Sequence, residues 1–203
     1  MPETDASPII DLLRTAVPGA TLEAAPAIDM PTVFIDREHS LEVMTALRDH
    51  PGLQFALLSD VTALDRLPAS PRFVIVYHLV CLGAAFAVGT PAPSRRLRVK
   101  VLVDGEDPRI ESVVPIFPGA GWLEREVFDL FGIVFEHHPD LRRILTPDEW
   151  TGHPLRKDYP VQIRKTTPSW EPIQLSVEEF AENIRRQRAT AHEQARGTEP
   201  SGE

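Results

Sequence analysis

The stretch LRVKVLV, residues 97–103, decides the fold, because apolar side chains occupy every odd-numbered position of it. The even-numbered positions hold Arg98, Lys100 and Leu102. Successive side chains of a β-strand point to opposite faces of the sheet, so this alternation predicts a strand with one buried and one wet face. Such a strand is typical of an antiparallel sheet.

The neighbouring segments complete an α+β pattern. Residues 73–82 are apolar on both faces, as a central strand would be. Further strands are expected at 32–35, 55–58 and 110–114, and helices at 8–17, 37–49 and 119–131. We therefore expect residues 1–135 to form a two-layer α+β core domain, with a mainly antiparallel sheet and packed helices.

The periodic pattern ends after residue 133. Prolines recur at positions 139, 147, 154, 160, 168 and 172, and no helical or strand period survives between them. A long stretch without regular structure is abnormal in a compact domain and usually marks a functional or partner-bound segment. We therefore expect residues 136–175 to form an extended partner-binding strap. A capping box at Ser176 and Glu179 then predicts a short helix within 176–203, followed by a frayed acidic tail.

Composition and missing motifs exclude several kinds of protein. A formal net charge of -9 argues against nucleic acid as the main partner, because binding phosphates needs a basic surface. The single Cys81 excludes an internal disulfide, an iron–sulfur cluster held by this chain and a zinc-ribbon site. Glu124 stands where a dinucleotide fingerprint would need its third glycine, and there is no phosphate-binding loop. We expect no cofactor and no catalytic residue in this chain.

An uncharged run at residues 73–89 raises the question of a membrane span. A transmembrane helix needs about 20 apolar residues, and this run is slightly shorter. It also begins with β-branched residues, which are typical of strands. The run therefore predicts a buried strand followed by a loop of small residues. No secretory segment opens the chain, so we expect a cytoplasmic protein without a direct membrane span.

Three histidines offer the best candidate for a metal site. His137, His138 and His153, together with Asp140, could act as ligands in a free-standing metal enzyme. However, adjacent histidines point apart in an extended chain, and the spacing matches no standard ligand set. We therefore favour the alternative, in which they are polar groups of a loop-rich segment.

The strap mixes charged side chains with apolar ones. Its charged residues Arg142, Arg143, Arg156, Lys157 and Asp158 alternate with apolar residues that include Trp150, Leu155 and Tyr159. They could be solvated surface. The mixture is also what a partner-binding segment needs, because aromatic residues anchor an interface and arginines bind facing carboxylates.

The last helix of the core domain carries a carboxylate among apolar side chains. An unpaired buried charge is very costly, so we expect Glu124 to be paired, with Arg142 or Arg143 as the nearest candidates. Arg125 and Asp129 lie on the opposite, polar face of this helix, where their spacing predicts a favourable i,i+4 pair.

The stretch WLEREVFDLFGIVFEHHPDLRRILTPDEWTGHPLRKDYP, residues 122–160, closely resembles the signature region of the C subunit of respiratory complex I, the NADH-quinone oxidoreductase. This is the 30-kDa subunit family. The match is continuous and runs through ERE, DLFGI, HPDLRRIL and GHPLRKDYP. Gly121, Phe128 and His137 depart from the residues common at these places, which affects the expected local packing and not membership.

The resemblance implies a peripheral-arm subunit without a redox centre of its own. It would lie on the cytoplasmic side of the bacterial cell membrane, holding the large quinone-site subunit and the adjacent iron–sulfur subunits together. The complex passes electrons from NADH to quinone and translocates protons. FMN, the iron–sulfur clusters and quinone would belong to the partner subunits. The equivalent subunit of a membrane-bound hydrogenase, or of a complex with another electron donor, is an alternative, as is the metal enzyme.

The resemblance and the residue pattern together predict a partner interface. Its candidate residues are Glu124, Arg125, Arg142, Arg143, Trp150, His153, Leu155, Arg156, Lys157, Asp158 and Tyr159.

Overall fold

The structure, a computed structural model, describes residues 4–26, 29–82 and 94–160, together with the single residues 178 and 182. The chain divides into two compact units, Met1–Tyr159 and Pro160–Glu203. The first unit therefore includes residues 136–159 of the expected strap. The rest of the strap, the expected C-terminal helix and the acidic tail lie almost entirely outside the described residues.

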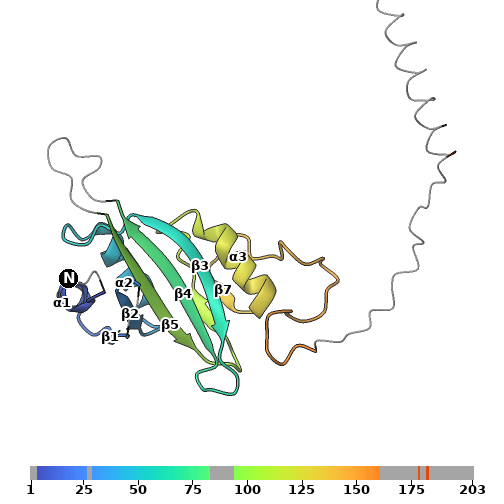
Figure 1. The fold of residues 1–203 in the computed structure, drawn as a ribbon, viewed down its shortest axis with the longest axis horizontal. Helices are drawn as coiled ribbons and strands as arrows, with labels where there is room; N and C mark the ends of the chain where they lie inside the picture. The colour runs from blue at the N-terminus through green and yellow to red at the C-terminus, as the bar shows by residue number, and fades with distance from the viewer. Residues whose placement is uncertain (1–3, 27–28, 83–93, 161–177, 179–181, 183–203) are drawn as a thin grey trace, which may run out of the picture. The chain divides into compact units, whose positions relative to one another are not determined.

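A five-stranded sheet forms the centre of the first unit (Figure 1). Its strands, in spatial order, are β1 (Leu22–Ala24), β2 (Thr32–Ile35), β5 (Arg95–Val103), β4 (Phe73–Cys81) and β3 (Leu57–Asp65). Strands β2 and β5 pair in parallel, and the other three neighbouring pairs are antiparallel. The mainly antiparallel sheet expected from the sequence is confirmed.

The alternation along the sequence determines which face of the sheet is buried. The odd-numbered side chains of β4 and those of β5 from Leu97 onward are buried, and they join the helices in one hydrophobic core. The helices are α1 (Ser7–Ala16), α2 (Ser40–Asp49) and α3 (Ala120–Phe131), which contribute Leu13, Met44 and Val127 among others. The two-layer α+β fold is therefore confirmed.

Two strands differ from their expected bounds. The strand expected at 55–58 is β3, Leu57–Asp65, which lies at an edge of the sheet. An edge position tolerates exposed polar residues, so most of its length lacks the apolar pattern of β4. The strand expected at 110–114 ends earlier, as β6 (Arg109–Glu111), and pairs in parallel with β7 (Val134–Glu136) in a separate two-stranded sheet.

The uncharged run at residues 73–89 begins as strand β4, as expected. Its remainder from residue 83 onward lies outside the described residues. Within the described parts of the chain, none of the helices has the length and apolar character that crossing a membrane requires.

Candidate partner-binding segment

The C-terminal end of α3 is capped by a distant part of the chain, the 152–160 segment. An α-helix leaves its last four carbonyls without partners inside the helix. Here four successive carbonyls, at residues 129–132, each accept a hydrogen bond from this segment. His153 Nδ1 donates to Asp129 O (2.9 Å) and Leu155 N donates to Leu130 O (3.0 Å). Arg156 donates twice, from Nε to Phe131 O (2.5 Å) and from Nη2 to Gly132 O (3.4 Å).

Gly132 allows this close approach. It takes a left-handed conformation, with φ of 71°, and its N–H donates to Phe128 O at 2.8 Å. A Cβ atom at this position would lie 2.5 Å from the ring of His153 and 2.7 Å from Nη2 of Arg156. Both the backbone conformation and the packing therefore require glycine here.

Asp129 holds another part of the strap, residues 143–146 (the 143–146 loop), against the same helix. Its side chain is fully buried, and Oδ2 accepts the backbone N–H groups of Ile144, Leu145 and Thr146 at 3.0, 2.7 and 2.9 Å. Oδ1 accepts from Arg143 Nη1 at 2.8 Å and from the hydroxyl of Thr146. Burial alone would raise the pKa of Asp129, but these donors hold it well below its usual range.

Arg143 joins this loop to the 152–160 segment. Besides Asp129, it donates to the hydroxyl of Thr146 at 2.9 Å and, through Nη2, to the carbonyl of Gly152 at 3.0 Å. The i,i+4 pair expected between Arg125 and Asp129 is not formed, because Asp129 lies under the 143–146 loop and takes Arg143 as its cation.

The far end of the 152–160 segment binds the turn between β3 and β4. Arg72 lies between two carboxylates, with Nη2 at 2.7 Å from Asp65 Oδ2 and 2.6 Å from Asp158 Oδ1. The N–H of Lys157 donates to Asp65 Oδ2 at 2.8 Å. The guanidinium groups of Arg72 and Arg156 both lie over the ring of Phe73, at 4.9 and 5.4 Å from its centroid.

Glu124 is hydrogen-bonded, but it does not pair with Arg142 or Arg143, as the sequence suggested. It is fully buried and accepts hydrogen bonds from Ser112 Oγ at 2.6 Å and from Val113 N at 2.8 Å. Arg143 binds Asp129 instead, and Arg142 donates to Asp140 at 2.9 Å. The inner face of α3 points toward the chain after β6, whereas these arginines lie at its outer face. Burial raises the pKa of Glu124 to about 7.

Arg125 packs along the outside of α3. Its Nε donates to the carbonyl of Arg142 at 3.1 Å and its Nη2 to that of Arg143 at 3.3 Å. Its guanidinium lies 4.9 Å from the centroid of the Trp122 ring. Arg125 thus binds backbone carbonyls of the strap, and its guanidinium covers one face of the Trp122 ring.

Three large apolar side chains remain exposed in this region. Trp122 is 67% exposed, Leu145 61% and Leu155 52%. Trp150 and Tyr159 are partly buried, and the ring of Tyr159 lies against Gly152. The polar groups of the strap are therefore used largely within the chain, while several of its apolar groups face outward.

The three histidines of the possible metal site bind separate parts of the chain. His137 lies 2.8 Å from Glu111, His138 bonds to the carbonyl of Gly121, and His153 bonds to that of Asp129. Among the described residues, no three His, Cys, Asp or Glu side chains are grouped so that they could hold a metal ion.

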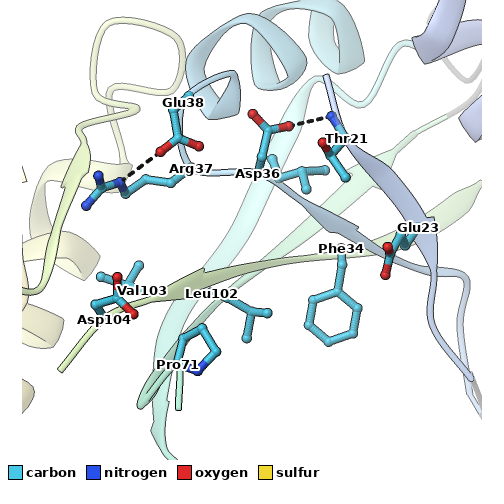
Figure 2. Close-up of a pocket in the computed structure, with 11 residues that line it drawn as sticks. Thr21, Glu23, Phe34, Asp36, Arg37, Glu38, Pro71, Leu102, Val103 and Asp104 are labelled. Carbon is cyan, nitrogen blue, oxygen red and sulfur yellow. Dashed lines mark hydrogen bonds and ion pairs between the residues drawn. The ribbon is translucent and has the colours of Figure 1, made fainter. Parts of the chain in front are cut away.

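A cleft of about 320 Å³ opens elsewhere, at the ends of β2 and β5 (Figure 2). Figure 2 shows Asp36 accepting a hydrogen bond from Thr21 N, and Arg37 beside Glu38, across from Pro71. None of the residues singled out from the sequence lines this cleft. The strap and α3 therefore contain the candidate site.

Sequence reasoning missed three residues that position the strap: Asp65, Arg72 and Asp129. Asp129 looked like a solvated residue on the polar face of a helix. Arg72 pairs with Asp158, which is 86 positions away, and nothing in the local pattern of either residue indicates the other. The one local signal that could have drawn attention to Arg72 is its position, since it is a charged residue directly before the buried strand β4.

Comparison with protein families matches residues 33–165 to the family described as "Respiratory-chain NADH dehydrogenase, 30 Kd subunit". The C subunit of the NADH-quinone oxidoreductase of Roseiflexus sp. (strain RS-1) is 40% identical over 157 residues, 77% of this chain and 85% of that protein. The corresponding C subunit of Saccharopolyspora erythraea is 44% identical over 131 residues, 64% of this chain and 49% of that protein. The chain thus spans about half the length of the latter relative.

Two solved structures share the fold. Nqo5, in the form of a trypsin-resistant fragment, is 35% identical with a TM-score of 0.51, covering 66% of this chain and 98% of that chain. A chain of the membrane-bound sulfane sulfur reductase, an archaeal respiratory membrane complex, has a TM-score of 0.59 over 77% of this chain and 86% of that chain. The latter is 22% identical, so it shows likeness of fold alone.

Proposed function

The chain belongs to the family of the 30-kDa subunit of respiratory-chain NADH dehydrogenase, and on this premise we propose that it is a non-catalytic structural subunit of a proton-translocating NADH-quinone oxidoreductase. It contributes no cofactor. FMN, the iron–sulfur clusters and quinone belong to partner subunits, and this chain holds the quinone-site subunit and the iron–sulfur subunits in fixed positions. The complex lies at the cytoplasmic side of the bacterial cell membrane, to which this subunit is peripheral.

The observation that carries this proposal is the arrangement of the 152–160 segment on α3. Its backbone and its polar side chains hold it to the helix end and to the turn after β3, while Leu155 stays exposed, as do Leu145 of the strap and Trp122 of α3. Exposed apolar side chains gathered in one region mark interaction sites. A segment already held in shape loses less conformational freedom on binding, which favours a tight interface.

Polar and apolar residues of the strap therefore have different roles. Arg156 holds the segment to the end of α3, Asp158 and Lys157 hold it to the turn between β3 and β4, and the exposed apolar side chains bind the partner. We expect substitution of Arg156 to weaken assembly indirectly, by loosening the segment from the end of α3.

The test is a Leu155→Asp variant of the full chain, expressed with the other subunits of its complex. We expect less intact complex on native gels after extraction in mild detergent, because a charge replaces an apolar contact. Leu64→Asp is the matched control, since Leu64 is 50% exposed and lies on β3, outside the strap. Turnover per assembled complex should not change in either variant.

Full assembly of the Leu155→Asp complex with strongly reduced turnover would contradict the proposal, because it would place the segment in the chemistry. Equal loss of complex in the Leu64→Asp control would instead show that the interface is not located at the strap.

A complex with another electron donor is a second candidate: the same fold occurs in a chain of the archaeal sulfane sulfur reductase, and likeness of fold does not select the donor. Pulling down the tagged full chain in mild detergent distinguishes the two. Co-purification of a flavin-containing, NADH-oxidising subunit supports the first candidate, and co-purification of a different donor module supports the second.

A further inference from the structure

Helix α3 buries a carboxyl group among neutral groups only. Glu124 is fully buried, and its two hydrogen bonds come from the Ser112 hydroxyl and the Val113 backbone N–H. Among the described residues, no lysine or arginine forms an ion pair with it. A buried carboxylate without a cation is costly, and taking up a proton removes that cost.

His138 lies beside Glu124, and both nitrogens of its ring are bound to backbone groups. Its Nδ1 accepts the backbone N–H of Asp140 at 3.0 Å, so this nitrogen carries no proton. The proton is therefore on Nε2, which donates to the carbonyl of Gly121 at 3.0 Å. The same Nε2 lies 3.9 Å from Oε2 of Glu124, and the ring is almost completely buried.

A third buried group faces Glu124 from the sheet. Tyr77 of β4 is fully buried, and within the described part of the chain its hydroxyl has no hydrogen-bond partner. Burial raises the pKa of Tyr77, and the negative charge of Glu124 raises it further, so the phenol stays neutral. In the part of the chain that the structure describes, the titratable groups that face Glu124 are thus Tyr77 from β4 and His138 from the chain after β7.

We propose that the buried carboxyl group of Glu124 binds and releases a proton, and that its charge decides which oxygen Nε2–H of His138 binds. When Glu124 is protonated, its bond with Ser112 reverses, so that the carboxyl O–H donates to Ser112 Oγ, while Nε2–H of His138 keeps its bond to Gly121 O. When the proton leaves to solvent, Nε2–H turns to the carboxylate, because a hydrogen bond to an ionised acceptor is roughly twice as strong as one to a neutral acceptor.

This exchange moves the start of the strap. The backbone N–H of Asp140 is bonded to Nδ1 of the same ring, so a shift of the ring toward Glu124 displaces residue 140 or breaks that bond. Residue 140 leads directly into the 143–146 loop that Asp129 holds on α3. The proton on Glu124 therefore affects the backbone at Asp140, just before the 143–146 loop. This inference does not depend on the proposed function.

The first test follows the carboxyl carbons of the full chain by NMR, with ¹³C-labelled glutamate, as pH is varied. We expect one resonance to titrate with a midpoint of about 7, as burial implies for Glu124, instead of near the ordinary value of 4.5. That resonance should be absent in Glu124→Gln and present in Glu126→Gln, a matched control at an exposed site on the same helix. Titration of Glu124 near the ordinary value would overturn the proposal.

The second test uses the wild-type chain alone, so it stands even if the Glu124→Gln variant folds poorly. The amide shift of Asp140 and the ring nitrogen shifts of His138 should change with the same midpoint as the Glu124 carboxyl. If Glu124 titrates near pH 7 and these shifts do not follow it, the carboxyl is only a buried acid and the coupling to the strap is refuted.

Discussion

Replacing Asp129 with asparagine should release the 143–146 loop from α3. The two oxygens of Asp129 accept from five donors: three backbone N–H groups at Oδ2, and Arg143 and the Thr146 hydroxyl at Oδ1. Asparagine has one oxygen and one NH2 group, so in either orientation the NH2 group faces donors. The substitution also leaves Arg143 without its carboxylate.

The size of the effect follows from these contacts. Breaking a buried ion pair by removing one partner costs about 3–5 kcal/mol. Asparagine keeps one acceptor, so we expect the lower end of this range, about 3 kcal/mol, which corresponds to a roughly 150-fold change in an equilibrium constant. The loss should be local, because Asp129 joins the loop to the helix and contributes nothing to the apolar core.

Amide hydrogen exchange of the full chain measures this directly, since local opening appears as lost protection. Protection of the Leu145 and Thr146 amides should fall roughly 150-fold in the Asp129→Asn variant, given the same 3 kcal/mol. Asp148→Asn is the control, because Asp148 is exposed in the same loop. A change below about tenfold, or 1.4 kcal/mol, would refute the view that Asp129 anchors the loop.

Three further predictions concern single residues and the domain boundary. Gly132→Ala should lower the free energy of unfolding by about 1–2 kcal/mol because of the left-handed backbone alone, and by more because the new Cβ atom would contact His153. Urea denaturation measures this change, and an unchanged midpoint would contradict the requirement for glycine. The pKa of Glu124 is higher in the folded chain than the ordinary 4.5, so its contribution to stability is complete below that value and is lost as pH rises through about 7. The unfolding constant should therefore rise about tenfold between roughly pH 6 and pH 8 because of Glu124, and Glu124→Gln should abolish that part of the slope. Limited proteolysis should cut first beyond His138; early cleavage between residues 73 and 103 would contradict this boundary.

The sheet was predictable because its signal is local. Strand β5 alternates strictly from Leu97 onward, and β4 is apolar on both faces, so each could be identified without its neighbours. Strand β3 was placed too early because an edge strand carries polar side chains on its exposed face. The sequence of β3 alone does not indicate that it pairs with β4; this pairing is evident only in the complete sheet.

The contacts of α3 were less predictable because backbone N–H groups bind both of its buried carboxylates, three of them at Asp129 and one at Glu124. Every residue of the chain except proline offers such a donor, so the sequence does not mark which one a carboxylate will use. Arginines near in sequence therefore seemed the best partners for Glu124, although Ser112 and Val113 bind it. Asp129 appeared exposed because a helical wheel does not show that the 143–146 loop covers it.

The capping of α3 by the 152–160 segment has a consequence for biosynthesis. The helix is complete in the growing chain at residue 131, but the groups that satisfy its final carbonyls follow at residues 153–156. At about 5–20 residues per second, the ribosome adds these groups roughly 1–5 s later. During this delay the last turn of α3 depends on water for its hydrogen bonds. A chain that ends between these two points lacks the groups that cap α3, and we expect the last turn of its helix to fray.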